Sequence, residues 1–173
     1  MISTPRLRPE DILVMNIVGG RRSASLRNRG LRELKGLSLP TICDALDLSQ
    51  NELKVWPNLS SQSCAYAKYV RVLYLAFNKL ESFEKPLSTV FPYIQSLSLR
   101  GNQLSDVQGL LYGLRGLPLL HLDIGINPIW PTNIEEQDVL IRLLLSSCKT
   151  LQTVTGRRIT LNMRRGGSQS SKR

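Results

Sequence analysis

Histidine, cysteine and aromatic residues are scarce in this 173-residue sequence, and each scarcity excludes a class of function. The single histidine, His121, leaves little chance of a multi-histidine metal site. None of the motifs GxxxxGKS/T, GxGxxG and GxSxG occurs. His121 could still act alone as a base, but a lone histidine on a strand surface is more often a contact residue. We therefore expect no enzyme activity, no metal and no cofactor.

Cysteine pairs and long apolar runs are missing as well. The three cysteines, Cys43, Cys64 and Cys148, are odd in number and form no CxxC pair. Neither a disulfide framework nor a zinc cage is expected, which suits a reducing compartment. The apolar stretch 12–18 is interrupted by Asn16 and preceded by two acidic residues, so it does not predict a signal peptide. No run approaches the roughly 20 apolar residues of a membrane span. We therefore expect a soluble intracellular protein with no membrane partner and no small-molecule substrate.

Acidic residues are absent from residues 149–173, which hold seven Lys and Arg. The whole chain has a net charge of +10, but residues 36–148 hold eight basic and ten acidic residues. The excess charge therefore lies at the two ends, where 1–35 add eight basic against three acidic residues. Basic ends suit a polyanionic partner such as nucleic acid, and they also suit a simple solubilising role.

One pattern organises the chain, the leucine-rich template L-x-x-L-x-L-x-x-N-x-L. Its four copies are Cys43, Leu46, Leu48, Asn51, Leu53; Val70, Leu73, Leu75, Asn78, Leu80; Ile94, Leu97, Leu99, Asn102, Leu104; and Leu119, Leu122, Ile124, Asn127, Ile129. The asparagines are 27, 24 and 25 residues apart, as in leucine-rich repeats. The L-x-L segment predicts a short strand with both apolar side chains facing a core. The buried Asn amide would satisfy backbone groups where the chain turns.

The ends of the array are atypical, as stacked repeats require. Ala24, Leu26, Arg29 and Leu31 fit a degenerate first repeat, and residues 9–18 suggest a short amphipathic cap helix. Residues 135–147 predict a helix, and Leu151, Val154 and Gly156 a truncated last strand. We predict an α/β fold: a right-handed solenoid of about five repeats with a parallel, concave sheet. One domain would span 1–162 (N-terminal cap 1–20, repeats 21–133, C-terminal cap 134–162), followed by a basic, disordered tail at 163–173.

The template also predicts which side chains the concave face displays. Tyr74 and Phe77 form an exposed aromatic pair there, which is typical of a protein-binding hot spot, although single exposed apolar residues carry no meaning. The predicted partner-binding residues are Asp47, Val72, Tyr74, Phe77, Arg100, His121, Asp123 and Ile126. Arginines on a rigid scaffold can hold phosphates in bidentate fashion. The candidate RNA-binding residues are Arg21, Arg22, Arg27, Arg29, Arg157 and Arg158. Few aromatics accompany these arginines in the sequence, so little argues for base-specific readout.

The run DALDLSQNELK at 44–54 resembles the second repeat of the U2 small nuclear ribonucleoprotein A-prime family. The resemblance continues through the spacings of 24 and 25 residues to the cap at 138–156, and it covers roughly residues 7–160. It implies a nuclear, spliceosomal protein whose concave face holds a B-double-prime type protein with an RNA-recognition motif. The pair would bind a stem-loop of U2 small nuclear RNA. By position, Asp47, Tyr74, Phe77, Arg100, His121 and Asp123 would face that partner, and the N-terminal arginines would lie toward the RNA.

Two departures from the family pattern stand out. The spacing of 27 residues between Asn51 and Asn78 is long, and Val154-Thr155 replaces the usual Leu-Asp of the cap. The alternative function is a leucine-rich adaptor that regulates a phosphatase or motor subunit without RNA. A membrane-surface binder ranks last, because no basic amphipathic helix or lipidation motif is present.

Overall fold

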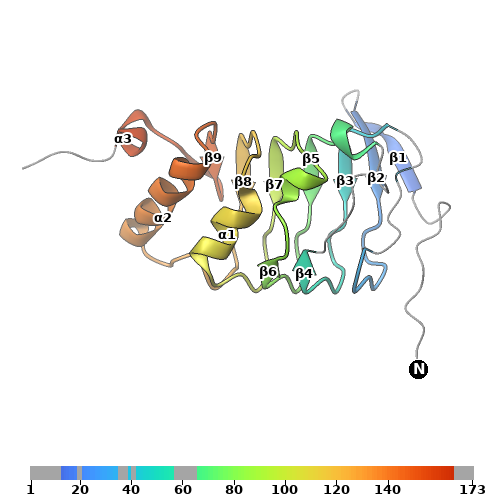
Figure 1. The fold of residues 1–173 in the computed structure, drawn as a ribbon, viewed down its shortest axis with the longest axis horizontal. Coiled ribbons are helices and arrows are strands. Elements are labelled where there is room, and N and C mark those ends of the chain that lie inside the picture. The colour runs from blue at the N-terminus through green and yellow to red at the C-terminus, as the bar shows by residue number, and fades with distance from the viewer. Residues whose placement is uncertain (1–12, 19–20, 35–38, 40–41, 57–65, 166–173) are drawn as a thin grey trace, which may run out of the picture.

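The computed structural model describes residues 13–18, 21–34, 39, 42–56 and 66–165, with only the backbone described for 13–18. In these ranges a long sheet runs along one side of the molecule, and short helices, turns and a small second sheet form the other sides (Figure 1). The predicted α/β class with a mostly parallel sheet is therefore confirmed.

The main sheet has the strand order β1-β2-β3-β5-β7-β8-β9-β10. Its strands are β1 (Leu13–Val18), β2 (Arg21–Ser25), β3 (Ala45–Asp47), β5 (Val72–Tyr74), β7 (Ser96–Ser98), β8 (His121–Asp123), β9 (Thr153–Val154) and β10 (Arg157–Arg158). Strands β2 to β9 pair in parallel, whereas β1 and β10 pair antiparallel to their neighbours at the two ends. One row of the register is Ala24, Leu46, Leu73, Leu97, Leu122 and Val154, all buried. The template thus identified the core face of each strand.

The predicted asparagine ladder is present and follows the ends of the strands. Asn102 donates from Nδ2 to the carbonyl oxygens of Leu75 (3.0 Å) and Leu99 (2.8 Å), and its Oδ1 accepts from the N–H of Leu80 at 2.9 Å. Asn51, Asn78 and Asn127 repeat this pattern. All four side chains are buried. Each therefore pairs backbone groups of two adjacent repeats that would otherwise be buried without partners.

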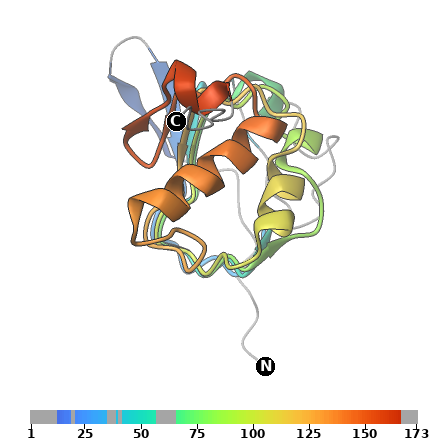
Figure 2. The same cartoon turned by 90° about the vertical axis from the view of Figure 1, so that its left-hand side faces the viewer.

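The remaining elements close the molecule opposite the sheet. They are the second sheet of β4 (Val55–Trp56) and β6 (Ser82–Phe83), the 3-10 helices η2 (Ala67–Tyr69) and η3 (Leu87–Thr89), and the helices α1 (Val107–Leu114), α2 (Ile134–Ser147) and α3 (Leu161–Arg164). Figure 2 shows α1 and α2 side by side across from the strands. Asp106 and Asn133 begin these helices, because their side chains accept N–H groups of the first turn.

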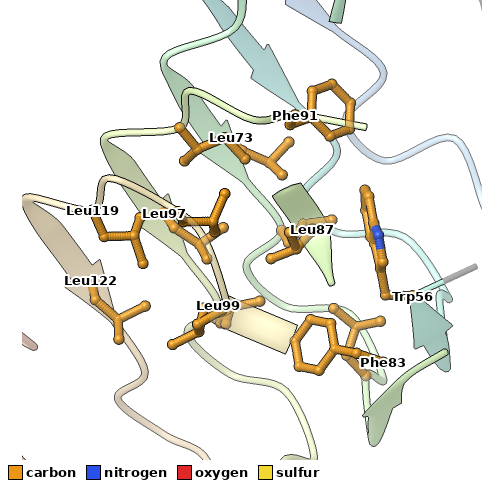
Figure 3. Close-up of a cluster of buried hydrophobic side chains, with 14 of the residues drawn as sticks. Trp56, Leu73, Phe83, Leu87, Phe91, Leu97, Leu99, Leu119 and Leu122 are labelled. Carbon is orange, nitrogen blue, oxygen red and sulfur yellow. The ribbon is translucent and has the colours of Figure 1, made fainter. Parts of the chain in front are cut away.

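Leucines and a few aromatic rings fill the space between the sheet and these elements (Figure 3). The rings of Trp56 and Phe91 are tilted with centroids 5.9 Å apart, and both side chains are fully buried. Each buried leucine stabilises the fold by about 2 kcal/mol relative to an exposed one. The core is continuous from the first repeat to the C-terminal cap, so the sheet is held rigidly along its length.

The predicted N-terminal cap helix is wrong for residues 13–18, which form strand β1. Residues 9–12 of that prediction lie outside the described residues. Val18 pairs with Arg21, so two glycines separate β1 from β2, and Gly-Gly is a two-residue hairpin signal. Val14, Ile17 and Val18 are β-branched and favour a strand. The antiparallel hairpin covers an edge of the sheet that a helix would have left unpaired.

The predicted start of the tail at residue 163 falls inside α3. Met163 packs against the core, and the Arg164 guanidinium donates to the carbonyl oxygens of Lys149 and Leu151. These contacts order the chain up to Arg165, while 166–173 lie outside the described residues. The other C-terminal predictions are confirmed, since α2 and β9 occupy the segments expected for a helix and a last strand.

Candidate functional site

The sheet face opposite the buried leucines displays the residues between the template positions, and we call it the outer face. Alternation along each strand places Asp47, Tyr74, Ser98 and Asp123 in one row across four parallel strands. The row formed by Ala45, Val72, Ser96 and His121 lies beside it. The structure therefore brings most of the predicted partner-binding residues together on one surface.

Phe77 and Ile126 form an apolar ridge at the C-terminal ends of the strands. Each precedes a ladder asparagine, and both have φ of 55°, in the left-handed region. Gly101 holds the position between them with φ of 68°. A Cβ atom on Gly101 would lie 2.5 Å from Cδ1 of Phe77, so the phenyl ring rests directly on that glycine. We call these three residues the left-handed ridge.

The ridge combines exposure with backbone strain. The side chains of Phe77 and Ile126 are 49% and 61% exposed, so burial does not offset the cost of their backbone conformation. A left-handed backbone costs a non-glycine residue about 1 to 3 kcal/mol, and isoleucine tolerates it poorly. Strain of this kind at exposed apolar side chains is typical of a functional surface.

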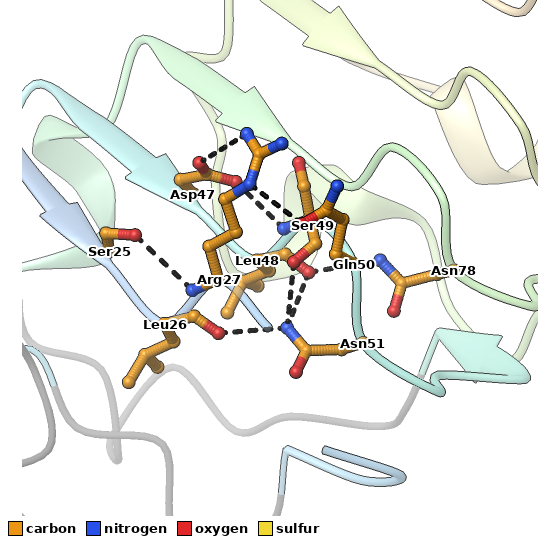
Figure 4. A network of polar contacts seen from close by, with 9 residues as sticks. All are labelled: Ser25, Leu26, Arg27, Asp47, Leu48, Ser49, Gln50, Asn51 and Asn78. Carbon is orange, nitrogen blue, oxygen red and sulfur yellow. Dashed lines mark hydrogen bonds and ion pairs between the residues drawn. The ribbon is translucent and has the colours of Figure 1, made fainter. Parts of the chain in front are cut away.

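Ion pairs flank the aromatic side chains on both sides. Arg27 lies 3.7 Å from Asp47 and donates from Nε to Oε1 of Gln50 at 3.1 Å (Figure 4). On the other side, Arg100 lies 3.8 Å from Asp123. The carboxylates are oriented by the backbone, because Asp47 accepts the N–H of Ser49 (2.8 Å) and Asp123 that of Gly125 (3.0 Å). All four charged groups are partly exposed and can exchange partners on binding.

Two predicted contact residues need comment. Val72 lies on the outer face as predicted but is only 7% exposed, and its role as a contact residue stays a prediction. Its short side chain lies between Ala45 and Ser96 on the neighbouring strands, whereas the longer Tyr74 extends past its neighbours and is 44% exposed. His121 is exposed, and its Nδ1 lies 2.9 Å from Oγ1 of Thr153.

The six candidate RNA-binding arginines are not brought together. Arg21 and Arg22 are exposed at the start of β2, and Arg29 is exposed at the first, degenerate rung of the ladder. Arg27 points instead to the outer face, where it pairs with Asp47. These four lie in the first repeat, whereas Arg157 and Arg158 form strand β10 at the far end of the sheet.

Arg157 is committed to a structural ion pair. Its Nη2 lies 2.6 Å from Oδ1 of Asp138, and its Nη1 donates to Oε1 of Gln137 at 3.1 Å. Both acceptors belong to α2, so Arg157 ties the last hairpin to that helix. Arg158 is exposed and has no such partner among the described residues. Of the two, only Arg158 is free to contact a polyanion.

Arg27, a candidate RNA-binding residue, and Gln50, which is not among the predicted contacts, both belong to the outer face. The template itself indicates this placement. Two residues separate the last strand leucine from the ladder residue in each repeat; Arg27 is the first of these two in its repeat and Gln50 the second in the next repeat.

A shallow hollow of about 390 Å³ elsewhere is lined by Arg32, Glu52, Lys54 and Lys79. The hydrogen bond from Arg32 holds the pKa of Glu52 below its usual value, with Lys79 adding to the effect.

The described residues contain no group of three His, Cys, Asp or Glu side chains arranged to hold a metal ion. None of the helices that the structure describes is long and apolar enough to cross a membrane.

Comparison with known proteins bears on the fold. The chain is similar to a chain in the crystal structure of the Drosophila melanogaster SNF/U2A' complex, with a TM-score of 0.70 over 93% of this chain and 89% of that chain. The chain has a U2A'-like leucine-rich repeat fold. The U2A'-like fold is shared at 21% sequence identity, so the likeness is one of architecture. No protein-family model matches the sequence, and no curated protein sequence matches it significantly.

Proposed function

We propose that the chain is a non-catalytic scaffold whose outer face binds a protein with an RNA-recognition motif, of the B-double-prime type. In this proposal the scaffold is one domain, residues 1–162, built as a right-handed solenoid of about five repeats. Together the two proteins bind a stem-loop of U2 small nuclear RNA in the nucleus. The exposed basic side chains of the ends, Arg21, Arg22, Arg29 and Arg158, add contacts to phosphates.

The outer face carries the proposal. It presents Tyr74 and the left-handed ridge between two oriented ion pairs, which is the arrangement of an apolar anchor inside a charged rim. Backbone strain at Phe77 and Ile126 is retained although neither side chain is buried. The similar chain from Drosophila melanogaster was solved in a complex, SNF/U2A', which supports a protein partner for this fold.

The test is an affinity purification of the full chain from cells, followed by identification of the bound protein and RNA. A Tyr74→Ala/Phe77→Ala variant should lose the protein partner, because it removes the central anchors. Tyr112→Ala is the matched control: Tyr112 is an equally exposed tyrosine, 44%, on α1. A partner with an RNA-recognition motif and recovery of U2 small nuclear RNA support the proposal. A phosphatase or motor subunit without RNA would establish the adaptor alternative, and unchanged binding by the double variant would refute the outer-face assignment.

A further inference from the structure

Two tyrosines and two cations form a continuous cluster where strands β5 and β7 begin, at the upper edge of the sheet in Figure 1. The Lys68 ammonium lies 5.3 Å from the ring centroid of Tyr69, and the Arg71 guanidinium lies 5.0 Å from that of Tyr93. Arg71 also donates from Nη1 to the carbonyl oxygen of Lys68 at 2.8 Å, which joins the two pairs. We call these four residues the strand-entry patch.

The rings of the patch remain open to solvent. Tyr69 is 38% exposed, although the Tyr66 ring also lies against it with centroids 6.4 Å apart, and Tyr93 is 53% exposed. Each tyrosine lies three residues before one of the paired residues Val72 and Ser96, so both lie at the edge where these strands begin. Neighbouring strands are about 4.8 Å apart, so the rings belong to successive steps of the same edge. A pair of exposed rings held by cations can accept two flat groups.

The sheet register places the patch in line with the arginines of the first repeat. Arg22, Asp44 and Arg71 are consecutive along one row: Asp44 donates its N–H to the Arg22 carbonyl (2.7 Å), and Arg71 donates its N–H to the Asp44 carbonyl (2.7 Å). Arg21 precedes Arg22 and is exposed. The row also contains one carboxylate, since Asp44 Oδ2 accepts the N–H of Arg22 at 2.9 Å. Four cations against one carboxylate leave the edge strongly positive.

Single-stranded nucleic acid binds to surfaces that combine exposed aromatic rings, on which bases stack, with a row of cations that follows the phosphate backbone. Bases stack on aromatic rings at about 1 to 3 kcal/mol each, and Lys and Arg contact phosphates. A duplex keeps its bases stacked internally and offers them no free face for Tyr69 or Tyr93. An acidic peptide would use the cations but would gain little from the rings.

We propose that the strand-entry patch binds single-stranded RNA, with bases stacked on Tyr69 and Tyr93 and phosphates held by Lys68, Arg71, Arg21 and Arg22. This site rests on the RNA role proposed above, but it needs no protein partner and lies apart from Tyr74 and the left-handed ridge. The patch adds two aromatic rings to the basic surface, whereas few aromatic residues lie near these arginines in the sequence.

The test measures fluorescence anisotropy of a labelled oligouridine of about 12 nucleotides with the full chain alone. Tyr69→Ala/Tyr93→Ala should weaken binding at least about tenfold, whereas Tyr69→Phe/Tyr93→Phe should retain it because the rings remain. Lys68→Gln/Arg71→Gln should reduce the slope of log affinity against log salt by about 1.4. Tyr112→Ala and Lys85→Gln/Arg142→Gln are the matched controls, with no change expected. Circular dichroism confirms that each variant is folded.

Binding by Tyr69→Ala/Tyr93→Ala that equals the original chain would overturn the proposal, and so would competition by polyglutamate as effective as that by unlabelled oligouridine. An equal affinity for an RNA duplex would also count against it. The result of this test is independent of the result of the outer-face test. Tyr74→Ala/Phe77→Ala should leave oligouridine binding intact, and failure to find a protein partner would not change the affinity of the chain for RNA.

Discussion

At the scale of single residues, the left-handed ridge contains side chains whose backbone conformation lowers the stability of the fold although they are exposed. Ile126 is β-branched, has φ of 55° and is 61% exposed, so the fold receives little in return for its strain. Asparagine enters the left-handed region much more readily than isoleucine does. We propose that contact with a partner, and not the stability of the free chain, explains the residue type at position 126.

The prediction at this scale is that Ile126→Asn stabilises the free protein by about 1 kcal/mol and weakens binding of its protein partner. Urea unfolding and a binding titration measure the two effects. Val139→Asn is the matched control, because Val139 is also β-branched and exposed, at 56%, but lies within helix α2. It should bring no such gain. A destabilised Ile126→Asn would show that the isoleucine contributes to the fold itself.

Residues whose surroundings the repeat itself dictates could be predicted from the sequence, and residues whose surroundings depend on side chains of neighbouring strands could not. Asn51 and Leu46 occupy positions that the buried geometry of each repeat dictates. Val72 shares its outward orientation with Tyr74, but its burial depends on the small neighbours Ala45 and Ser96. Tyr69 and Tyr93 lie outside the 11-residue template, and only the strand register shows that Arg71, the cation between them, lies in one row with Arg22.

At the scale of elements, the last hairpin depends on α2. The ion pair between Arg157 and Asp138 joins β10 to the helix across 19 residues of sequence, and both side chains are partly exposed. No sequence pattern predicts a pair at that separation, because it depends on how α2 packs. Similarly, the apolar run at 13–18 fits a helix or a strand, and the pairing partner β2 decides between them.

We predict that Arg157→Gln lowers the free energy of unfolding by about 1 kcal/mol, while Arg158→Gln leaves it unchanged. The reason is that only Arg157 has a carboxylate partner in the described part of the chain. Urea unfolding at low salt measures both variants, which carry the same change of charge. Equal stability of the two would mean that the ion pair contributes nothing measurable to the cap.

At the scale of the whole molecule, two buried thiols link folding to pH. Burial raises the pKa of Cys43 to about 11, with the Asp44 carboxylate adding to the increase, and burial raises the pKa of Cys148 to about 11. An unfolded cysteine has a pKa of about 8.5. The folded state therefore favours the neutral thiols. Their contribution to stability is complete below about pH 8.5 and is lost as the pH rises toward 11.

Between these pH values we expect unfolding to become easier by about 1.4 kcal/mol per pH unit for each thiol. Urea unfolding at several alkaline pH values measures the slope. A Cys43→Ala/Cys148→Ala variant is the reference, since its other alkaline groups titrate as before. The original chain should show the steeper decline. Parallel curves would indicate that the thiols ionise equally in the folded and unfolded states.

The elements that lie opposite the main sheet change along the molecule, from the short strands β4 and β6 to the helices α1 and α2. Strands such as β4 and β6 pack at about 4.8 Å, the same spacing as the main sheet, so the early repeats can stack nearly straight. Helices α1 and α2 need about 8 to 10 Å between their axes, roughly twice the strand spacing. The perimeter behind β7 to β9 is therefore longer than the sheet in front of it. We therefore expect the stack to bend there, and we propose that the hollow of this bend, at His121 and Asp123, faces the partner.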